Sequence, residues 1–428
     1  MKYFNALRCF FFSGRPSAMP AYENFQRLFI LISAHAISTL TAFFAAFYIG
    51  VDDFGLFNRQ MSLSVIISTI VILGSYQILL RSNRDDLLQI SIFSSIVGFA
   101  IAVLVMMMFV ATGGNQQTVL VAHSLSMLYI TSAIAQNFKK FNFALFLRVL
   151  LPAGLTASCI AILIVKFDKP YSMIGIVAPA IWLSSAILLV VFLMSFPKGD
   201  CKWDQCQKHR FRRYVEMLKG SLRIFMFSVS FVVVGQLDVV ALGLRHDDMA
   251  SGWYGLAARL AGLSTLGHLA VTAFVPRLIV ENLCDQRKLQ AILSESLRFS
   301  VAIFAFATLG SGLYVAYVTV VRDVSPSLFM IPFVILAFGA FINVATGPCG
   351  FLLTMSNNDR TAAYIAIAGA IADILLFLLA LPSLSSIEAA TITAMATGSI
   401  YVAMAFCAKE KTGVDATILG LRRQTRDA

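Results

Sequence analysis

The sequence has few charged residues. Only 13% of its 428 residues are Asp, Glu, Lys or Arg, whereas 59% are hydrophobic. A soluble domain typically carries roughly 25% charged residues, and a single hydrophobic core stops growing beyond about 250–300 residues. The shortage of charge therefore excludes a soluble globular protein of this length. It favours a chain whose apolar surface is solvated by lipid.

The sequence also lacks a disulfide framework. Its seven cysteines are an odd number and are scattered along the chain, unlike the even, regular spacing of disulfide-rich domains. Cys201, Cys206 and His209 could be three metal ligands, but structural zinc sites usually have four, often in CxxC pairs. Unpaired thiols in a basic loop are the simpler interpretation, so we expect no bound metal.

Familiar catalytic signatures are missing as well. The sequence contains no HExxH, GxSxG or P-loop motif and no paired-carboxylate signature. These absences argue against an enzyme. They also argue against a pump driven by ATP, unless a partner chain supplies the ATPase.

The sequence contains many long apolar segments. A transmembrane helix needs roughly 20 apolar residues, and twelve segments meet that requirement. The longest interior link, 197–219, divides them into two sets of six and is rich in Lys and Arg. That link either lies on anionic lipid headgroups or acts as a hinge between two lobes. The predicted helices span 25–48, 61–81, 87–111, 117–138, 143–165, 171–196, 220–243, 252–276, 298–320, 327–352, 361–382 and 387–408.

The distribution of Lys and Arg predicts the orientation. With the N-terminus in the cytoplasm, 27 of the 33 basic residues fall on the cytoplasmic side or at helix ends there, and Arg259 lies inside a helix. Cytoplasmic loops carry such an excess, so both termini are predicted to be cytoplasmic. The net charge of +11 then reflects topology and contact with anionic membrane lipids, and nucleic-acid binding is not needed to explain it. The far-side loops hold Arg59, Lys166, Lys169, Arg245 and Arg322.

The two halves of the chain are weakly similar. In each half the first helix is followed by acidic residues and a glycine–aromatic turn, and the next helix ends at an arginine. Six helices per half make this a parallel repeat, whose axis runs along the membrane normal. The matching positions are Gly55 and Gly252, Phe57 and Tyr254, and Arg81 and Arg277.

The repeat predicts an all-α integral membrane protein of about twelve transmembrane helices in two six-helix lobes around a central cavity. The predicted parts are a cytoplasmic N-terminal segment (1–24), an N-lobe (25–196), a basic cytoplasmic linker (197–219), a C-lobe (220–408) and a cytoplasmic tail (409–428).

Several short segments resemble one family. They are Phe54–Phe57, Leu237–Gly243, Gly252–Leu260 and Gly347–Ser356. They are similar to Wzx-type lipid-linked oligosaccharide flippases of the multidrug/oligosaccharidyl-lipid/polysaccharide exporter superfamily. The resemblance implies that an undecaprenyl-pyrophosphate-linked oligosaccharide is moved from the inner to the outer leaflet of the bacterial inner membrane by alternating access. It implies energy from an ion gradient or membrane potential and an O-antigen or capsule pathway. A polysaccharide polymerase and a chain-length regulator are the implied partners.

Two other functions stay open. A drug/cation antiporter of the same superfamily would share the fold, but its cavity would favour acidic residues, and the predicted helices offer more Arg than Asp. A membrane polysaccharide polymerase would handle the same lipid-linked glycans. Such enzymes typically carry a large outer loop, however, and the predicted outer loops here are short.

Charged side chains inside the predicted helices are functional candidates, because charge in hydrocarbon is costly. Asp238 and Arg259 lie at similar predicted depth in consecutive helices, so an ion pair is plausible. One interpretation is a static pair that holds the two helices together. The other places Arg259 in the cavity, where it meets phosphate or sugar, with Asp238 as a gating partner. Replacing Arg322, in an outer loop, is expected to be neutral.

Two further residues could couple transport to an ion. His35 shares one face of the first helix with Arg27 and Ser38, which suits a cavity wall, and its imidazole could carry a coupling proton. Asp373 is the carboxylate nearest the centre of the bilayer and could bind a proton or a sodium ion. The alternative is that each is a satisfied packing residue. A coupling H+ or Na+ is the only cofactor that we expect.

A pyrophosphate headgroup needs cations, and Arg binds phosphate through its bidentate fork. Six arginines are candidate substrate-binding residues. Except for Arg259, they lie near predicted cytoplasmic helix ends, where ordinary snorkelling would also place them. They are Arg27, Arg81, Arg148, Arg223, Arg259 and Arg277.

Overall fold

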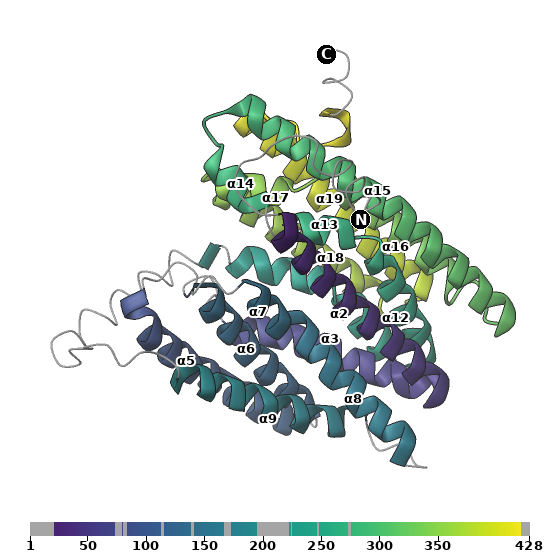
Figure 1. The fold of residues 1–428 in the computed structure, drawn as a ribbon. Coiled ribbons are helices and arrows are strands. Elements are labelled where there is room, and N and C mark those ends of the chain that lie inside the picture. The colour runs from purple at the N-terminus through teal and green to yellow at the C-terminus, as the bar shows by residue number, and fades with distance from the viewer. Residues whose placement is uncertain are drawn as a thin grey trace.

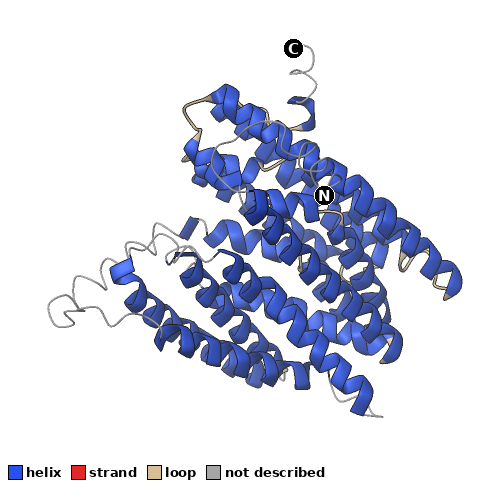
Figure 2. Ribbon diagram, viewed as in Figure 1, coloured by secondary structure: helices blue, strands red, loops and turns tan. Residues whose placement is uncertain are grey.

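A computed structural model describes residues 21–72, 79, 84–112, 115–137, 141–166, 173–194, 222–223, 225–245, 248–272 and 275–420. Every regular element in these ranges is helical (Figure 2). Helices suit apolar sequence in lipid, because they satisfy all backbone hydrogen bonds within the segment. Eight of them are long and apolar enough to cross a membrane, or ten if each of two bent pairs counts as one crossing.

The first half of the chain forms one group of helices. The fifth predicted span is built from α7, a π-helical turn and α8, and the other spans are single helices. The bounds are α2 (Ala21–Tyr48), α3 (Val51–Ile72), α5 (Arg84–Ala111), α6 (Gln116–Asn137), α7 (Phe141–Leu145), η1 (Phe146–Leu150), α8 (Leu151–Lys166) and α9 (Met173–Met194).

The second half contains three interrupted spans. A helix over Phe225–Val234 bends by 47° into α11 (Leu237–Leu244), and α16 (Met330–Thr346) bends by 42° into α17 (Cys349–Met355). The eighth span is divided into α12 (Asp248–Leu263), α13 (Leu266–Thr272) and α14 (Val275–Glu281). The remaining helices are α15 (Gln286–Val321), α18 (Asp359–Ala380) and α19 (Ser386–Thr412).

Each of the twelve predicted segments coincides with one of these helices or interrupted helices, so the expected all-α membrane fold is confirmed. Several predicted boundaries were wrong. The stretch predicted as an outer turn around Gly55 is helical from Val51, and Arg59 lies inside α3 instead of in a loop. Asp52 and Asp53 lie in the first turn of α3, where carboxylates favour a helix because they offset the positive end of its dipole.

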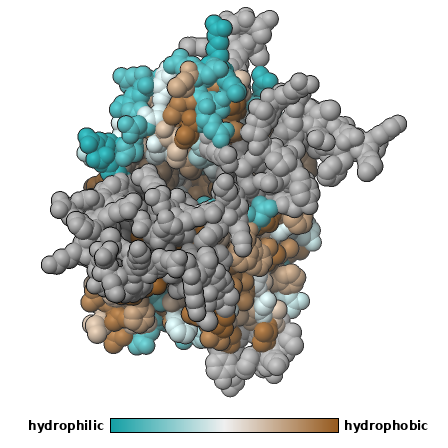
Figure 3. Space-filling model, turned by 60° about the vertical axis from the view of Figure 1, so that its left-hand side comes forward, coloured by the Kyte–Doolittle hydropathy of each residue, from teal (hydrophilic) through white to brown (hydrophobic). Residues whose placement is uncertain are grey.

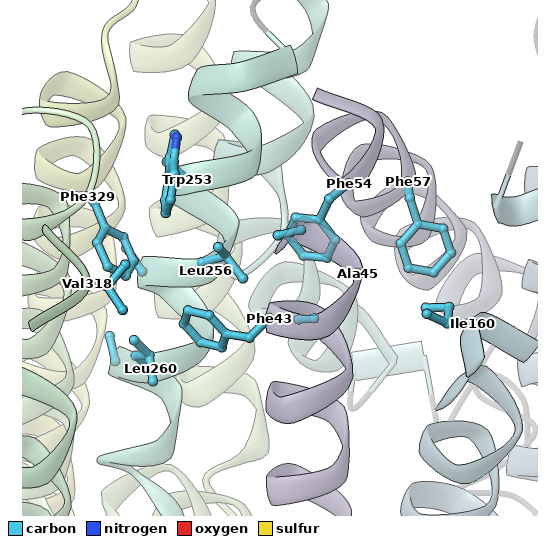
Figure 4. Close-up of a cluster of buried hydrophobic side chains, with 14 of the residues drawn as sticks. Phe43, Ala45, Phe54, Phe57, Ile160, Trp253, Leu256, Leu260, Val318 and Phe329 are labelled. Carbon is cyan, nitrogen blue, oxygen red and sulfur yellow. The ribbon is translucent and has the colours of Figure 1, made fainter. Parts of the chain in front are cut away.

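The helices of the two halves lie on opposite sides of the molecule, with α2 and α12 between them (Figure 1). One buried apolar cluster joins the halves. It brings Phe43 and Phe54 of the first half together with Trp253, Leu256 and Phe329 of the second (Figure 4). Burial in this cluster therefore holds two otherwise separate sets of helices together at one end.

At that end α3 and α12 cross at a contact that we call the glycine seam: Val51, Gly55, Asp248 and Gly252. A Cβ on Gly55 would lie 1.9 Å from the Asp248 carbonyl oxygen, and a Cβ on Gly252 would lie 2.3 Å from that of Val51. Only glycine therefore allows this approach of the two backbones. Gly55 and Gly252, and likewise Val51 and Asp248, are 197 positions apart in the sequence. The seam is therefore symmetric between the repeats.

The exposed surface suits lipid. Large apolar side chains cover its flanks, among them Phe306 and Leu379, which are 81% and 80% exposed. Figure 3 shows such residues in brown across one flank, with hydrophilic residues gathered at the upper end. The protein is therefore a multi-pass membrane protein.

A short segment after α19 is part of the core of the second half. Val414 and Ala416 are buried, and the Gln290 side chain forms hydrogen bonds with both the backbone N–H and the carbonyl of Asp415, at 2.8 and 2.6 Å. Burial raises the pKa of Asp415, but hydrogen bonds from Lys409 and Thr417 outweigh it and hold that pKa below its usual value. The segment is thus fixed by both packing and polar contacts.

Replacing Gln290 by Ala should release this segment. Two backbone groups of Asp415 would lose their partner, and each lost hydrogen bond costs about 0.5–1.5 kcal/mol. We expect faster proteolytic removal of the residues after Thr412, measured by mass spectrometry of the purified protein. Arg287→Ala, at an exposed position on the same helix, is the control. Equal proteolysis of the two variants would contradict this account.

Candidate functional site

A cavity of about 280 Å³ lies beside the glycine seam. Its walls come from α2, α3, α6, η1 and α8 of the first half, and Arg259 of α12 reaches into it from the second half. Three of the predicted site residues, His35, Arg148 and Arg259, therefore line one space although they are far apart in the sequence.

Arg259 bridges the two halves of the molecule. Its guanidinium donates hydrogen bonds to the Ser38 hydroxyl at 2.8 Å and to the Asn58 side-chain oxygen at 3.0 Å, and it lies 5.9 Å from the centre of the Phe54 ring. Its Nε atom is buried and has no hydrogen-bond partner. A buried N–H without a partner costs free energy, so this guanidinium has donor capacity that the described residues do not satisfy.

Arg148 lies across the cavity on the π-helical turn η1. Such turns inside α-helices are rare and frequent at functional sites. Its guanidinium lies 4.8 Å from the centre of the Tyr129 ring, which is a cation–π contact. The side chain is exposed, so the positive charge is accessible to a ligand.

His35 has a defined tautomer. Its Nδ1 lies 2.9 Å from the carbonyl oxygen of Leu31, and a carbonyl can only accept, so Nδ1 carries the hydrogen. In the neutral ring Nε2 is then an acceptor. Because His35 lines the cavity, it can accept a hydrogen bond from a hydroxyl group there.

The described residues that line the cavity include two arginines and one histidine but neither Asp nor Glu. Hydroxyl and aromatic groups make up much of the rest, among them Ser38, Thr41 and Tyr129. In a site partly shielded from water this charge balance attracts anions and repels cations. The cavity is therefore suited to an anionic, hydroxyl-rich ligand.

A second polar site lies inside the second half. Asp238 is buried and lies in the first turn of α11, just after the bend in the seventh predicted span. One of its oxygens accepts hydrogen bonds from the Tyr254 hydroxyl at 2.6 Å and from the Thr393 hydroxyl at 3.3 Å. The other accepts from the backbone N–H of Val239 at 2.8 Å. Asp238 is thus well satisfied as an acceptor.

Asp373 is not satisfied in this way. Its side chain is fully buried, and neither of its oxygens has a hydrogen-bond partner. It is close enough to Asp238 to interact with it electrostatically. Two neighbouring buried carboxyls without a basic partner favour the arrival of a proton or a metal cation between them. We refer to Asp238 and Asp373 as the acidic pair.

The predicted ion pair between Asp238 and Arg259 was wrong. The two residues have different partners, and none of the ion pairs in the described part of the chain joins them. Successive helical residues turn by 100°, so on α12 Tyr254 and Arg259 point in different directions. Tyr254 points to Asp238 and Arg259 to the first half. Similar predicted depth along consecutive helices did not establish the direction of the side chains.

Of the other candidate arginines, Arg223 has a described side chain, and it does not line the cavity. Arg223 is exposed and forms an ion pair with Asp359 at 3.5 Å, which favours a role in joining helix ends. Arg81 lies outside the described residues. Arg27 and Arg277 lie in α2 and α14, but their side chains are outside the described part of the structure.

Arg322 makes a contact that the sequence did not predict. It caps α15, and its guanidinium lies 4.7 Å from the centre of the Phe47 ring of α2. This cation–π contact joins the two halves beside the glycine seam. Replacing Arg322 would therefore disturb a contact between the halves, and an exposed arginine such as Arg287 is the better control.

Cys201, Cys206 and His209 lie outside the described residues. Among the residues that are described, no three His, Cys, Asp or Glu side chains form a group that could hold a metal ion. The linker 197–219 lies outside them as well.

The sequence did not reveal Asn58, Tyr129 and Tyr254 as site residues. Tyr254 was matched to Phe57 in the repeat, but only the fold shows that its hydroxyl meets Asp238. Asn58 lies against Gly255, where a Cβ would come within 2.2 Å of its amide nitrogen. Asn58 and Gly255 are again 197 positions apart, so the repeat could have shown that this amide lies near the symmetry axis.

Known proteins support the fold. A MATE multidrug transporter, DinF-BH, superposes with a TM-score of 0.58 at 14% identity, over 91% of this chain and 94% of its own. The lipid II flippase MurJ, in an inward closed conformation, superposes with a TM-score of 0.55 at 15% identity, over 88% of this chain and 86% of its own. A MOP superfamily transporter from Pyrococcus furiosus, described as having a binding pocket of reverse polarity, gives a TM-score of 0.50 at 13% identity, over 91% and 95%.

No family model matches the sequence, and no curated protein matches it either. The structural neighbours are transporters and a flippase of one superfamily, and their low identity to this chain means that they show the fold alone. The chain therefore has the fold of a membrane transporter. The choice between a drug and a lipid-linked substrate rests on the cavity.

Proposed function

We propose that this protein is a flippase for a lipid-linked oligosaccharide with an anionic, undecaprenyl-pyrophosphate-type headgroup. It would move this lipid from the inner to the outer leaflet of a bacterial inner membrane and would itself form no covalent bond with it. The observation that carries the proposal is the charge of the cavity, which has Arg148, Arg259 and His35 but no carboxylate among its described lining. A carrier of cationic drugs would need the opposite balance.

Each lining group has a role in this proposal. Arg148 and the free Nε of Arg259 would bind phosphate oxygens by charge-assisted hydrogen bonds. Tyr129 offers a ring face on which a sugar can lie, and Ser38, Thr41 and His35 can exchange hydrogen bonds with its hydroxyl groups. The oligosaccharide beyond the first sugar would extend toward the cytoplasmic end of the cavity, because the glycine seam closes the other end.

Alternating access would use the seam as its outer gate. The two halves meet there through the glycines, through the ion pair of Arg59 with Asp248 at 3.5 Å and through Arg322 on Phe47. With both termini in the cytoplasm, these contacts lie at the outer surface, so the conformation described here would be open to the cytoplasm. Exposure of the substrate to the outer leaflet would require the seam to separate.

The acidic pair would bind the coupling ion, a proton or a sodium ion. Its two carboxyls and the hydroxyl oxygen of Thr393 form a set of oxygen ligands of the kind that hard cations prefer. Asp373 would contribute the oxygens that now have no hydrogen-bond partner. A polysaccharide polymerase and a chain-length regulator would act on the flipped product.

A headgroup binding assay tests the proposed substrate class. Arg148→Ala should weaken binding of undecaprenyl pyrophosphate to the purified protein by at least about tenfold, because a hydrogen bond to a charged group contributes about 1.5–3 kcal/mol. Undecaprenol, which lacks the phosphates, should bind weakly to wild type and variant alike. The readout is native mass spectrometry in detergent.

Arg287→Ala is the control, because this arginine is exposed and remote from the cavity lining. If undecaprenol bound with the same affinity as undecaprenyl pyrophosphate, the anionic headgroup would not be what the cavity recognises. If a cationic dye bound more tightly than either lipid, the antiporter would be the better assignment.

A further inference from the structure

Tyr254 connects the acidic pair with the glycine seam. Its ring is fully buried and packs with Val239 and Leu242 of α11, and its hydroxyl donates to Asp238. On α12 it lies between Gly252 and Gly255, which both make close contacts with α3 of the other half. One short stretch of helix thus touches the proposed ion site on one side and the gate on the other.

We infer that Tyr254 is a positioning residue that transmits the occupancy of the acidic pair by a sodium ion to α12 and hence to the seam. The inference rests on the proposed coupling-ion site, and it adds the residue through which that site would act. It requires no proton transfer and no titration of the phenol.

The proposed transmission depends on the hydrogen bonds that the two oxygens of Asp238 accept. Both already accept hydrogen bonds, from Tyr254 and Thr393 at one oxygen and from the Val239 N–H at the other. A cation held between Asp238 and Asp373 would compete with these donors for the lone pairs of Asp238. It would repel the Tyr254 hydrogen, so the hydroxyl would give up its hydrogen bond to Asp238 and move away from the carboxyl.

Such a movement would be passed to the backbone of α12. The ring has no exposed surface, and close-packed interiors transmit displacements because they contain little free space. The Gly55 and Gly252 backbones approach one another too closely to admit even a methyl group. A shift of α12 by a few tenths of an ångström would therefore change the seam directly.

The test separates ion binding from the response of the gate. Spin labels on cysteines at Tyr48 and Met249, which are 68% and 50% exposed, would report the distance between the two halves near the seam. The full chain, with its native cysteines replaced, is compared in NaCl and in choline chloride at equal ionic strength. Na+ binding is measured separately as the increase in thermal stability with NaCl concentration.

Tyr254→Phe removes only the hydroxyl, and Tyr317→Phe, at an exposed site, is the matched control. We expect Na+ to change the distance distribution in the parent protein and in Tyr317→Phe. In Tyr254→Phe we expect Na+ still to bind, while the population that it shifts falls by at least about tenfold. Hydrogen exchange of residues 248–263 with and without Na+, in the chain with its native cysteines, gives a second readout if a labelled variant does not fold.

Two results would overturn the inference. If Tyr254→Phe responded to Na+ as the parent does, the hydroxyl would not transmit occupancy, and the proposed flippase function would be unaffected. If the parent protein neither bound Na+ nor responded to it, the sodium site itself would be wrong. Binding of the pyrophosphate headgroup to Arg148 is measured independently and would show whether the flippase assignment also fails.

Discussion

Arg259→Ala should abolish most transport while leaving the protein in the membrane. The substitution removes two hydrogen bonds that join the halves, to Ser38 and Asn58, and the buried Nε donor that we assign to the substrate. Each charge-assisted bond contributes about 1.5–3 kcal/mol, so we expect transport to fall by about one to two orders of magnitude. Flipping in proteoliposomes, normalised to the amount of protein, is the measurement.

Arg259→Lys should recover only a small part of this activity. Lysine keeps the charge but cannot donate to Ser38, Asn58 and a phosphate with the fixed geometry of a guanidinium. Arg287→Ala is again the control, because its side chain is exposed and outside the cavity. Equal flipping by Arg259→Ala and Arg287→Ala at equal abundance would show that Arg259 does not take part in transport.

Gly252→Val should prevent the gate from closing. Even a Cβ at this position would lie 2.3 Å from the Val51 carbonyl oxygen and 3.2 Å from its carbon, and backbone atoms cannot move aside as a side-chain end can. Overpacking typically costs about 1–3 kcal/mol. Here that cost would destabilise the conformation in which α3 and α12 are in contact. We expect accessibility of a cysteine at Ser251, which is fully buried beside Gly252, to rise strongly, measured with a membrane-impermeant thiol reagent.

Gly262→Ala is the matched control for this prediction. Gly262 lies on the same helix, α12, and nothing lies within 4 Å of the position that its Cβ would take. It should therefore fold and transport like the parent. Symmetry provides a second variant, because Gly55→Val meets the Asp248 carbonyl in the same way. If Gly252→Val left both accessibility and transport unchanged, the seam would not be a gate.

The general architecture followed from composition because lipid imposes strong rules. Apolar runs of about 20 residues must be helical to satisfy their backbone groups, and all twelve predicted segments contain helix in their described residues. The errors lie where local sequence is ambiguous. Residues 51–60, with Asp52, Asp53 and Gly55, look like a turn, and they are helical because their glycine packs on an equivalent helix of the other half.

The site was predictable in part. The sequence pointed to His35, Arg148 and Arg259 separately, either because a polar group is costly to bury in a membrane or because a phosphate needs a positive charge. The fold brings the three residues into one cavity. The pairing of Asp238 was wrong because depth along a helix does not fix the direction of a side chain around it. Tyr254 was missed for a related reason, since an aromatic residue in a transmembrane helix is usually lipid-facing or core, and its partner is 16 positions away.

The symmetric contacts show what the internal repeat adds. A weak match of Gly55 to Gly252 in sequence became a pair of reciprocal backbone contacts with one common offset. Neither glycine is conspicuous by itself, because isolated glycines are common in transmembrane helices. Their functional meaning lies in the meeting of the two halves, which only the three-dimensional structure displays.

The most direct test of the central claim is to delete the protein from its own bacterium and to locate the lipid-linked glycan. We predict that surface polysaccharide disappears and that undecaprenyl-pyrophosphate-linked repeat units accumulate on the cytoplasmic leaflet, with recovery by the intact chain but not by Arg259→Ala. Repeat units that reach the outer leaflet and stay unpolymerised, or a surface glycan that is unchanged by the deletion, would contradict the account.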